Sequence, residues 1–271
     1  MKTFFTAATA AVAVAGPWTV SDNKLLYNGT ETVLHGFSTT CTEYLLRGIG
    51  MDCWAFYDWN DHTNIITSLD SGTVGAVKGY FSQIMSDGVK PALRLPMTAS
   101  YWLGVETNAS KQNMGMYPKL SEQYQKMIGK IVEEMTGMGA VVILDLHWND
   151  DDNEQQNMAL KARSGTAGAV EFWESVSETF AGNDHVFYEL YNEPHNNETD
   201  VFIHGDNTYA GMLDMIAAVR KNSADQVLVV AGGNDWAYDA DSLITLEGQT
   251  DEQLMMYNFH PYMGQYQAGD K

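Results

Sequence analysis

Short apolar runs and longer amphipathic segments alternate along most of this chain. The apolar runs, with few polar interruptions, have the pattern of buried β-strands. They lie at Leu34–Thr40, Val89–Pro96, Val141–His147, Val186–Tyr191, Gln226–Ala231 and Leu254–Phe259. Helical periodicity predicts helices at Val74–Ser86, Ser121–Met135, Ala167–Phe180 and Asn207–Lys221. This alternation favours parallel strands joined by helical crossovers.

Two further segments stand outside this alternation. Lys24–Tyr27 and Thr30–Leu34 flank Asn28-Gly29, a strong signal for a two-residue β-hairpin ahead of the main fold. The long aromatic-containing segment Met97–Leu120 reads as an elaborated loop after the second strand. We find no low-complexity linker or block of charge that would separate two domains.

Polar residues follow the predicted strands at their C-terminal ends. They are Arg94, His147, Glu193, Asn234 with Trp236, and His260 with Tyr262. In a (β/α) barrel these ends converge on one mouth, where the chemistry of that architecture takes place. A doubly wound sheet also places its sites at strand ends, but the chain has neither a Gly-x-Gly-x-x-Gly turn nor a phosphate loop. The sequence therefore predicts a (β/α)8 TIM-barrel type, with about six of eight βα units present and an N-terminal β-hairpin.

Composition narrows the partners of such a domain. The chain has 271 residues, 45% of them hydrophobic and 18% charged, which suits one large globular domain. Its formal net charge of −20 repels polyanions, so we expect no nucleic-acid partner and no binding to anionic membranes. Neutral polymers remain possible.

The N-terminus is typical of an exported protein. Residues 1–15 combine Lys2, an apolar stretch and a small-x-small site before Gly16, which predicts a secretory signal peptide. The alternative is an N-terminal helix of the fold, and the segment is too short to span a bilayer. We therefore expect a secreted protein whose residues 16–271 form the barrel. In an oxidising compartment Cys41 and Cys53 form a disulfide candidate, although two free thiols are the alternative.

An acidic loop at Asn149–Glu154 superficially suggests Ca²⁺. The position that requires Gly is Gln155 and the bidentate Glu position is Lys161, so the loop fails the calcium pattern. It reads better as a solvated loop at the rim of a cleft. We expect no metal and no cofactor.

Six short motifs at predicted strand ends, in this order, carry a resemblance to a known family. They are His35-Gly36-Phe37, Arg94-Leu95-Pro96, Asp145-Leu146-His147, Asn192-Glu193-Pro194-His195, Gly233-Asn234-Asp235-Trp236 and His260-Pro261-Tyr262. Over most of its mature length the chain resembles the catalytic domain of glycoside hydrolase family 5, closest to its endo-β-1,4-glucanases (cellulases). Each triplet alone is weak, whereas their order and spacing are specific.

The resemblance implies roles for particular residues. Glu193 would be the catalytic acid/base and Asn192 would hold the sugar 2-hydroxyl. Arg94 would keep a nucleophilic carboxylate ionised, while His147, His260 and Tyr262 would orient the carboxylates and the sugar. Trp148 and Trp236 would be sugar-stacking platforms, with simple packing as the alternative for each.

The nucleophile is the missing part of this set. Retaining glycosidases need a second carboxylate about 5 to 5.5 Å from the acid, and the family places it on strand seven. Glu189 lies four residues deeper than Glu193, about 13 Å along the strand. Asp145 reads as a buried partner of a basic group, and Asp270 lies on the tail. We therefore expect no nucleophile in this chain, and a longer protein with roughly two more βα units.

These features together predict a secreted, monomeric glycosidase that cleaves internal β-1,4-glucosidic bonds of cellulose or related β-glucans with retention. β-Mannan and xyloglucan are competing substrates within the family. Two alternatives from other classes stay open. A metal-dependent hydrolase could use His147, His260 and Glu193 as ligands, and a catalytically inactive product could bind carbohydrate without turnover.

Overall fold

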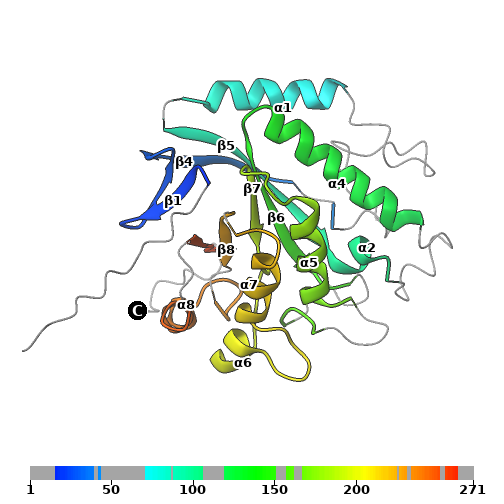
Figure 1. Cartoon of the computed structure of the whole chain (residues 1–271), viewed down its shortest axis with the longest axis vertical. Coiled ribbons are helices and arrows are strands. Elements are labelled where there is room, and N and C mark those ends of the chain that lie inside the picture. Colours follow the sequence, from blue (N-terminus) through cyan, green and yellow to red (C-terminus); the bar gives the residue numbers. More distant parts are fainter. Residues whose placement is uncertain are drawn as a thin grey trace, which may run out of the picture.

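A parallel six-stranded sheet, curled into a half-barrel, forms the centre of the molecule (Figure 1). The computed structural model describes residues 16–39, 42–43, 71–86, 88–105, 119–150, 157–161, 167–224, 226–230, 233–250 and 254–261. The strand order follows the chain, β4-β5-β6-β7-β8-β9. The strands are β4 (Val33–Ser38), β5 (Val89–Thr98), β6 (Val141–Trp148), β7 (Val186–Glu189), β8 (Leu228–Val230) and β9 (Met255–Tyr257). All six predicted strands are thus confirmed, and the fold is of the (β/α)8 barrel type.

Helices follow the strands and cover the outer face of the sheet in chain order (Figure 1). They are α1 (Ser71–Ile84), α2 (Ala99–Leu103), α4 (Lys119–Gly137), α5 (Ala169–Thr179), α6 (Thr199–His204), α7 (Met212–Arg220) and α8 (Ala240–Glu247). The four predicted helices are confirmed as α1, α4, α5 and α7. The prediction that the last begins at Asn207 is wrong. The Asp206 carboxylate accepts hydrogen bonds from the backbone N–H groups of Thr208 and Tyr209, which holds a turn there instead.

The predicted hairpin is present and belongs to a small antiparallel sheet. Its strands are β1 (Trp18–Ser21), β2 (Lys24–Tyr27) and β3 (Thr30–Glu31). Asn28 and Gly29 have φ angles of 50° and 77°, the left-handed pair that a type I′ turn requires. β1 was not predicted from the sequence.

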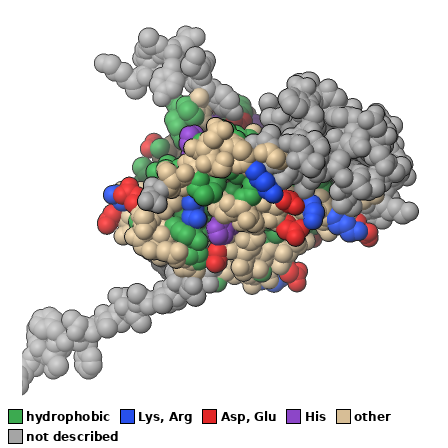
Figure 2. Space-filling view, turned by 90° about the horizontal axis from the view of Figure 1, so that it is seen from above, with side chains coloured by type: hydrophobic (Ala, Val, Ile, Leu, Met, Phe, Trp, Pro, Cys, Tyr) green, Lys and Arg blue, Asp and Glu red, His purple; other side chains and the backbone are tan. Residues whose placement is uncertain are grey.

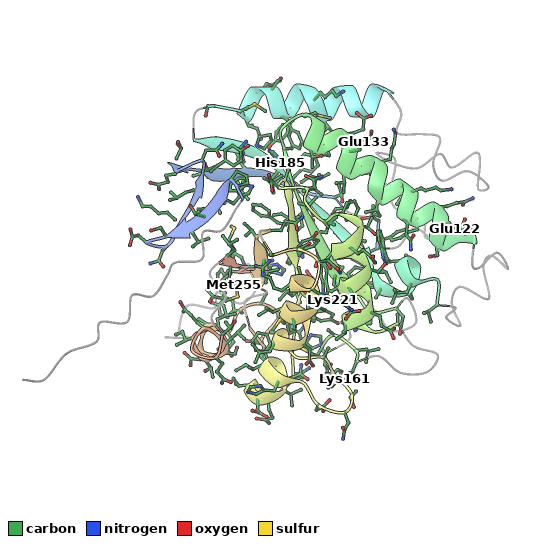
Figure 3. All side chains as sticks on the ribbon, viewed as in Figure 1. Glu122, Glu133, Lys161, His185, Lys221 and Met255 are labelled. Atoms are coloured by element: carbon green, nitrogen blue, oxygen red, sulfur yellow. The ribbon has the colours of Figure 1, made fainter. Side chains whose placement is uncertain are left out.

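Trp18 of β1 fills the N-terminal end of the half-barrel. It is fully buried, and its ring centroid lies 5.0 Å from that of Phe187 on β7. Its indole Nε1 donates to the Asp184 carbonyl at 2.7 Å. The neighbouring His185 lies beside the same small sheet (Figure 3), 6.0 Å from the Tyr27 ring. Because this end is packed with side chains, the C-terminal ends of the strands are left to form the mouth.

Two apolar cores hold the layers together. The larger core packs the helices on the outer face of the sheet and includes the fully buried Trp102 and Trp173. The smaller core lies inside the half-barrel. It contains Trp18, Ala92, Val141, Phe187, Val227 and Val229. β4 and β5 approach very closely at Gly36, where a Cβ would meet the Ala92 carbonyl oxygen at 1.6 Å. Only glycine fits there.

Several sequence predictions fall outside the part of the chain that the structure describes. These are the signal peptide, the Cys41–Cys53 disulfide and the role of Tyr262. No helix among the described residues is long and apolar enough to cross a membrane. On the described part of the face drawn in Figure 2, Lys and Arg side chains are scattered among acidic ones and form no continuous basic patch.

Candidate active site

Of the predicted strand-end residues, Arg94, His147, Glu193 and His260 line one cavity of about 410 Å³ at the C-terminal ends of the strands, whereas Asn234 and Trp236 do not line it. The residues that line it are Ser38, Arg94, His147, Asn192, Glu193, Asn258, Phe259, His260 and Pro261. They come from β4, β5, β6 and the segments that follow β7 and β9. Parallel strands deliver these side chains to the same edge of the sheet, as the sequence predicted.

Arg94 is the centre of a buried ionic network. Its Nε and Nη2 donate to the two oxygens of Glu189 at 2.6 and 2.8 Å, a bidentate pair. Nη2 also lies 2.9 Å from Asp145 Oδ2 and donates to Asn192 Oδ1 at 2.8 Å. Burial lowers the pKa of Arg94, but the charges of Asp145 and Glu189 raise it by more. The net shift is upward, so the guanidinium stays charged.

The two carboxylates of this network stand side by side. Asp145 and Glu189 are register partners on β6 and β7 and are both almost completely buried. Burial and the neighbouring Asp145 raise the pKa of Glu189, while the charge and hydrogen bonds of Arg94 act in the opposite direction. The positive charge of Arg94 is therefore shared by two carboxylates. The prediction that Asp145 is a buried partner of a basic group is confirmed.

His147 joins the network from β6. Its Nδ1 lies 2.7 Å from Asp145 Oδ2. Burial lowers the pKa of His147, but the charge and hydrogen bond of Asp145, together with the charge of Glu43, outweigh it, so that the net shift is upward. Glu43 is itself buried, and its carbonyl accepts a hydrogen bond from the Thr98 hydroxyl. Sequence reasoning did not single out Glu43.

Glu193 lies at the mouth with part of its side chain exposed. Its Oε1 is 2.7 Å from Nδ1 of His260, and 20% of the Glu193 side chain is accessible to solvent. The backbone N–H of His260 donates to the Ala237 carbonyl at 3.2 Å, which ties β9 to the loop after β8. A carboxyl group that lines a cavity and is partly accessible to solvent can exchange a proton with a bound molecule.

The two tryptophans differ in their surroundings. Trp148 is 8% exposed and does not line the cavity, which favours the packing alternative for it. Trp236 is half-buried, and its ring stacks on His195 with centroids 4.6 Å apart and planes 9° from parallel. Trp236 does not line the cavity either, and His195 occupies one face of its ring. Its φ of 50° is rare for an aromatic residue and indicates a tightly specified loop.

Two findings correct or extend the sequence analysis. Asn149, expected in a solvated loop, is fully buried because its amide donates to the Met158 carbonyl and the Tyr191 hydroxyl. Asn258, which was not singled out, bridges Glu189 and His260. The signal for Asn258 was available, because it precedes His260 by two residues and alternate residues of an extended segment face the same side. Among the described residues no group of three His, Cys, Asp or Glu side chains is placed to hold a metal ion.

A half-barrel of parallel strands with an ionisable cluster at its carboxyl ends defines a barrel of the (β/α)8 class. Comparison with known proteins places the chain more closely. The cellulase family (glycosyl hydrolase family 5) matches residues 60–271. The chain belongs to this family.

The chain is similar to individual members over part of their length. It is 28% identical over 182 residues to Endoglucanase A of Butyrivibrio fibrisolvens, covering 66% of this chain and 36% of that protein. The catalytic domain of Thermobifida fusca endoglucanase Cel5A shares the fold, with a TM-score of 0.53 at 17% identity over 90% of this chain and 64% of that one. A variant of the same domain, solved in complex with cellotetraose, gives the same values. The chain thus spans about a third of the curated relative and less than two thirds of the solved domain.

Proposed function

We propose that the protein containing this chain hydrolyses internal β-1,4-glucosidic bonds of cellulose or a related β-glucan with retention of configuration. The observation that carries this proposal is the convergence of Glu193, His260, Arg94 and Asn192 on one cavity at the barrel mouth. Family membership, the similarity to an endoglucanase and the fold shared with a domain that binds cellotetraose support the substrate class.

Glu193 has the role of acid/base in this proposal. Its carboxyl group protonates the glycosidic oxygen of the leaving sugar and later takes a proton from the attacking water. Asn192 Oδ1 accepts a hydrogen bond from Arg94, so the amide nitrogen of Asn192 is assigned to donate to the sugar 2-hydroxyl. His147 and His260 orient these groups, and the ring face of Trp236 that is turned away from His195 is assigned to sugar stacking.

The nucleophile is assigned to a residue outside the described part of the chain. Glu189 and Asp145 are both engaged by Arg94 and almost completely buried, so neither can attack a sugar in the cavity. A carboxylate that reaches the opposite side of the cavity from Glu193 would complete the retaining pair.

The direct test replaces Glu193 by Gln, which keeps the size and removes the proton donor. We expect hydrolysis of an unactivated β-glucan to fall about 10²- to 10⁴-fold, the usual contribution of general acid catalysis, as measured by reducing-sugar release. Glu198→Gln is the matched control, since Glu198 is exposed only five residues away. Unchanged hydrolysis in Glu193→Gln would overturn the acid/base assignment. Glucan binding without turnover in either form would favour the inactive binder.

The same assay separates the remaining alternatives. Faster hydrolysis of β-mannan or xyloglucan than of β-glucan would correct the substrate. Loss of activity on treatment with a chelator would favour the metal-dependent hydrolase, because two carboxylates need no metal.

We further propose that the protein is secreted after cleavage before Gly16, is monomeric, and carries a Cys41–Cys53 disulfide. The composition of residues 1–15 and the spacing of the two cysteines support this. N-terminal sequencing of secreted material, light scattering and thiol titration are the tests. A start at Met1 would contradict the cleavage, a dimeric mass would contradict the monomer, and two reactive thiols would contradict the disulfide.

A further inference from the structure

Asn258, which follows β9, links the ionic network of Arg94 to the carboxyl group of Glu193. Its Nδ2 lies 2.5 Å from Glu189 Oε1 and 2.8 Å from Nε2 of His260. On the other side of the imidazole ring, His260 Nδ1 lies 2.7 Å from Glu193 Oε1. A continuous chain of hydrogen bonds therefore runs from Arg94 through Glu189, Asn258 and His260 to Glu193.

The positions of the hydrogens in this chain follow from its acceptors. Both oxygens of Glu189 already accept hydrogen bonds from Arg94, so this carboxylate faces Asn258 as an acceptor. The amide nitrogen of Asn258, and not its oxygen, must then point at Glu189. An amide nitrogen carries two hydrogens, and the second one points at Nε2 of His260.

A hydrogen bond received at Nε2 decides the state of the imidazole. Nε2 must be unprotonated to accept it, so the ring proton lies on Nδ1 and is donated to Glu193. A doubly protonated ring would set an N–H of His260 against an N–H of Asn258 at 2.8 Å. Relieving that clash would require Asn258 to rotate away from Glu189.

We propose that Asn258 is a positioning residue that fixes His260 as the neutral Nδ1–H tautomer and thereby makes it a neutral donor to Glu193. The tautomer is independent of the glycosidase activity proposed above, whereas its effect on turnover rests on that proposal. The charged groups that face this part of the cavity are Glu193 after β7, Glu189 on β7 and Arg94 on β5. Asp145 and His147 of β6 join them through Arg94.

The consequence for Glu193 is electrostatic. A neutral donor stabilises the carboxylate less than an imidazolium would, so Glu193 keeps its proton to higher pH. A general acid needs that proton at the working pH. When Asn258 is lost, the ring becomes free to take a second proton, and the resulting positive charge favours the ionised form of Glu193.

The tautomer can be measured directly by ¹⁵N NMR of the histidine rings in the full chain, with His260→Gln to identify the signals. We expect His260 to show a protonated Nδ1 and an unprotonated Nε2 at neutral pH. A protonated Nε2 at neutral pH in the unaltered protein would overturn the proposal. This measurement requires neither a variant at Asn258 nor catalytic activity.

Asn258→Asp is the isosteric variant, because it replaces the two N–H donors by an acceptor of the same shape. We expect Nε2 of His260 to become protonated at neutral pH in this variant, because it then faces a carboxylate oxygen in place of an N–H. Asn222→Asp is the control, since Asn222 donates to Glu174 and Ser177 on α5, away from the cavity. An unchanged His260 spectrum in Asn258→Asp would contradict the assignment. If that variant does not fold, the spectrum of the unaltered protein still decides.

Activity supplies the second readout. In Asn258→Asp we expect the basic limb of the pH profile of kcat to move toward lower pH by about one unit, with KM changed little. An unchanged profile in an active variant would contradict the link to Glu193. These profiles are measured on the protein that contains this chain. If neither its unaltered form nor its Asn258→Asp form hydrolyses β-glucan but the NMR result holds, the proposed function fails and the tautomer assignment stands.

Discussion

At the residue scale, Arg94 is the side chain on which the inside of the barrel depends. It neutralises two buried carboxylates that stand next to each other on β6 and β7. We expect Arg94→Met to lower the free energy of unfolding by about 3 to 5 kcal/mol, the usual cost of leaving a buried charge unpaired. Arg94→Lys should recover only part of this loss, because an ammonium group cannot form the bidentate pair with Glu189.

Urea denaturation at neutral pH measures the effect of the Arg94 substitution. The control is Lys221→Met, which removes an ion pair whose two side chains are 61% and 40% exposed. Exposed pairs contribute about 0 to 1 kcal/mol, so the control should change little. Equal losses in the two variants would show that the buried network is no more important than a surface pair.

His147 gives the network a dependence on pH. Asp145 and Glu43 raise its pKa in the folded protein against the opposing effect of burial. A raised pKa means that the stabilisation is complete below the unfolded value of about 6.5 and is lost as the pH rises through the folded value. We therefore expect the free energy of unfolding to fall with rising pH in that window, and His147→Gln to remove part of this slope.

The quantity to follow is the difference in free energy of unfolding between the unaltered protein and His147→Gln. Glu189 also has a raised pKa and contributes a slope of the same sign, which cancels in this difference. Denaturation at several pH values from about 5 to 9 provides it. A difference that grows with pH would mean that the folded pKa of His147 is lowered.

At the scale of elements, the sequence predicted what is set by local periodicity. The six strands and four long helices each carry a repeated apolar pattern over many residues, and all are present. β1, α2, α6 and α8 were not predicted, since they are four to eight residues long and too short to show a period. α2 (Ala99–Leu103) lies in the segment Met97–Leu120, so the prediction that this whole segment is a loop is wrong. Strand ends were less certain, and β9 keeps only Met255–Tyr257 of the predicted Leu254–Phe259.

The site was predictable to the same extent. The residues that reach the cavity follow from their place at strand ends, which depends only on topology. Their partners depend on the register between strands. Asp145 and Glu189 lie opposite each other on β6 and β7, and this pairing of like charges is what requires Arg94 between them. Register across a parallel sheet is a long-range property that a single sequence does not reveal.

The most deeply buried contact of the small N-terminal sheet with the barrel is made by Trp18, and Leu25 and Tyr27 pack beside it. Trp18 packs inside the half-barrel and donates a hydrogen bond to the Asp184 carbonyl. We expect Trp18→Ala to lower the free energy of unfolding by about 3 to 5 kcal/mol through the cavity that it leaves. Trp18→Phe keeps most of the packing and loses the hydrogen bond, so about 1 to 3 kcal/mol is expected. Chemical denaturation measures both, and equal losses would show that the hydrogen bond, and not the packing, is decisive.

At the scale of the whole molecule, the two ends of the half-barrel have separate tasks. The N-terminal end is filled by Trp18 and its apolar neighbours, and the C-terminal end carries the ionised groups around the cavity. Because Glu189 lies between the apolar core and the mouth, the ionic network couples the stability of the barrel to the geometry of Glu193. A substitution inside the barrel should therefore affect turnover without touching the substrate.

The net charge of −20 acts on the molecule as a whole. The 35 acidic residues outnumber the 15 basic ones, so repulsion among the negative charges dominates. This repulsion is stronger in the compact state than in the extended chain. At 0.1 M salt, interactions between exposed charges more than about 10 Å apart are largely screened, whereas buried pairs are little affected. We therefore expect the thermal midpoint of unfolding to rise as NaCl increases from about 10 to 150 mM, by the same amount in the unaltered protein and in Arg94→Met. Scanning calorimetry with sucrose at equal osmolarity as the control tests this. A midpoint that falls with NaCl would mean that favourable surface ion pairs outweigh the repulsion.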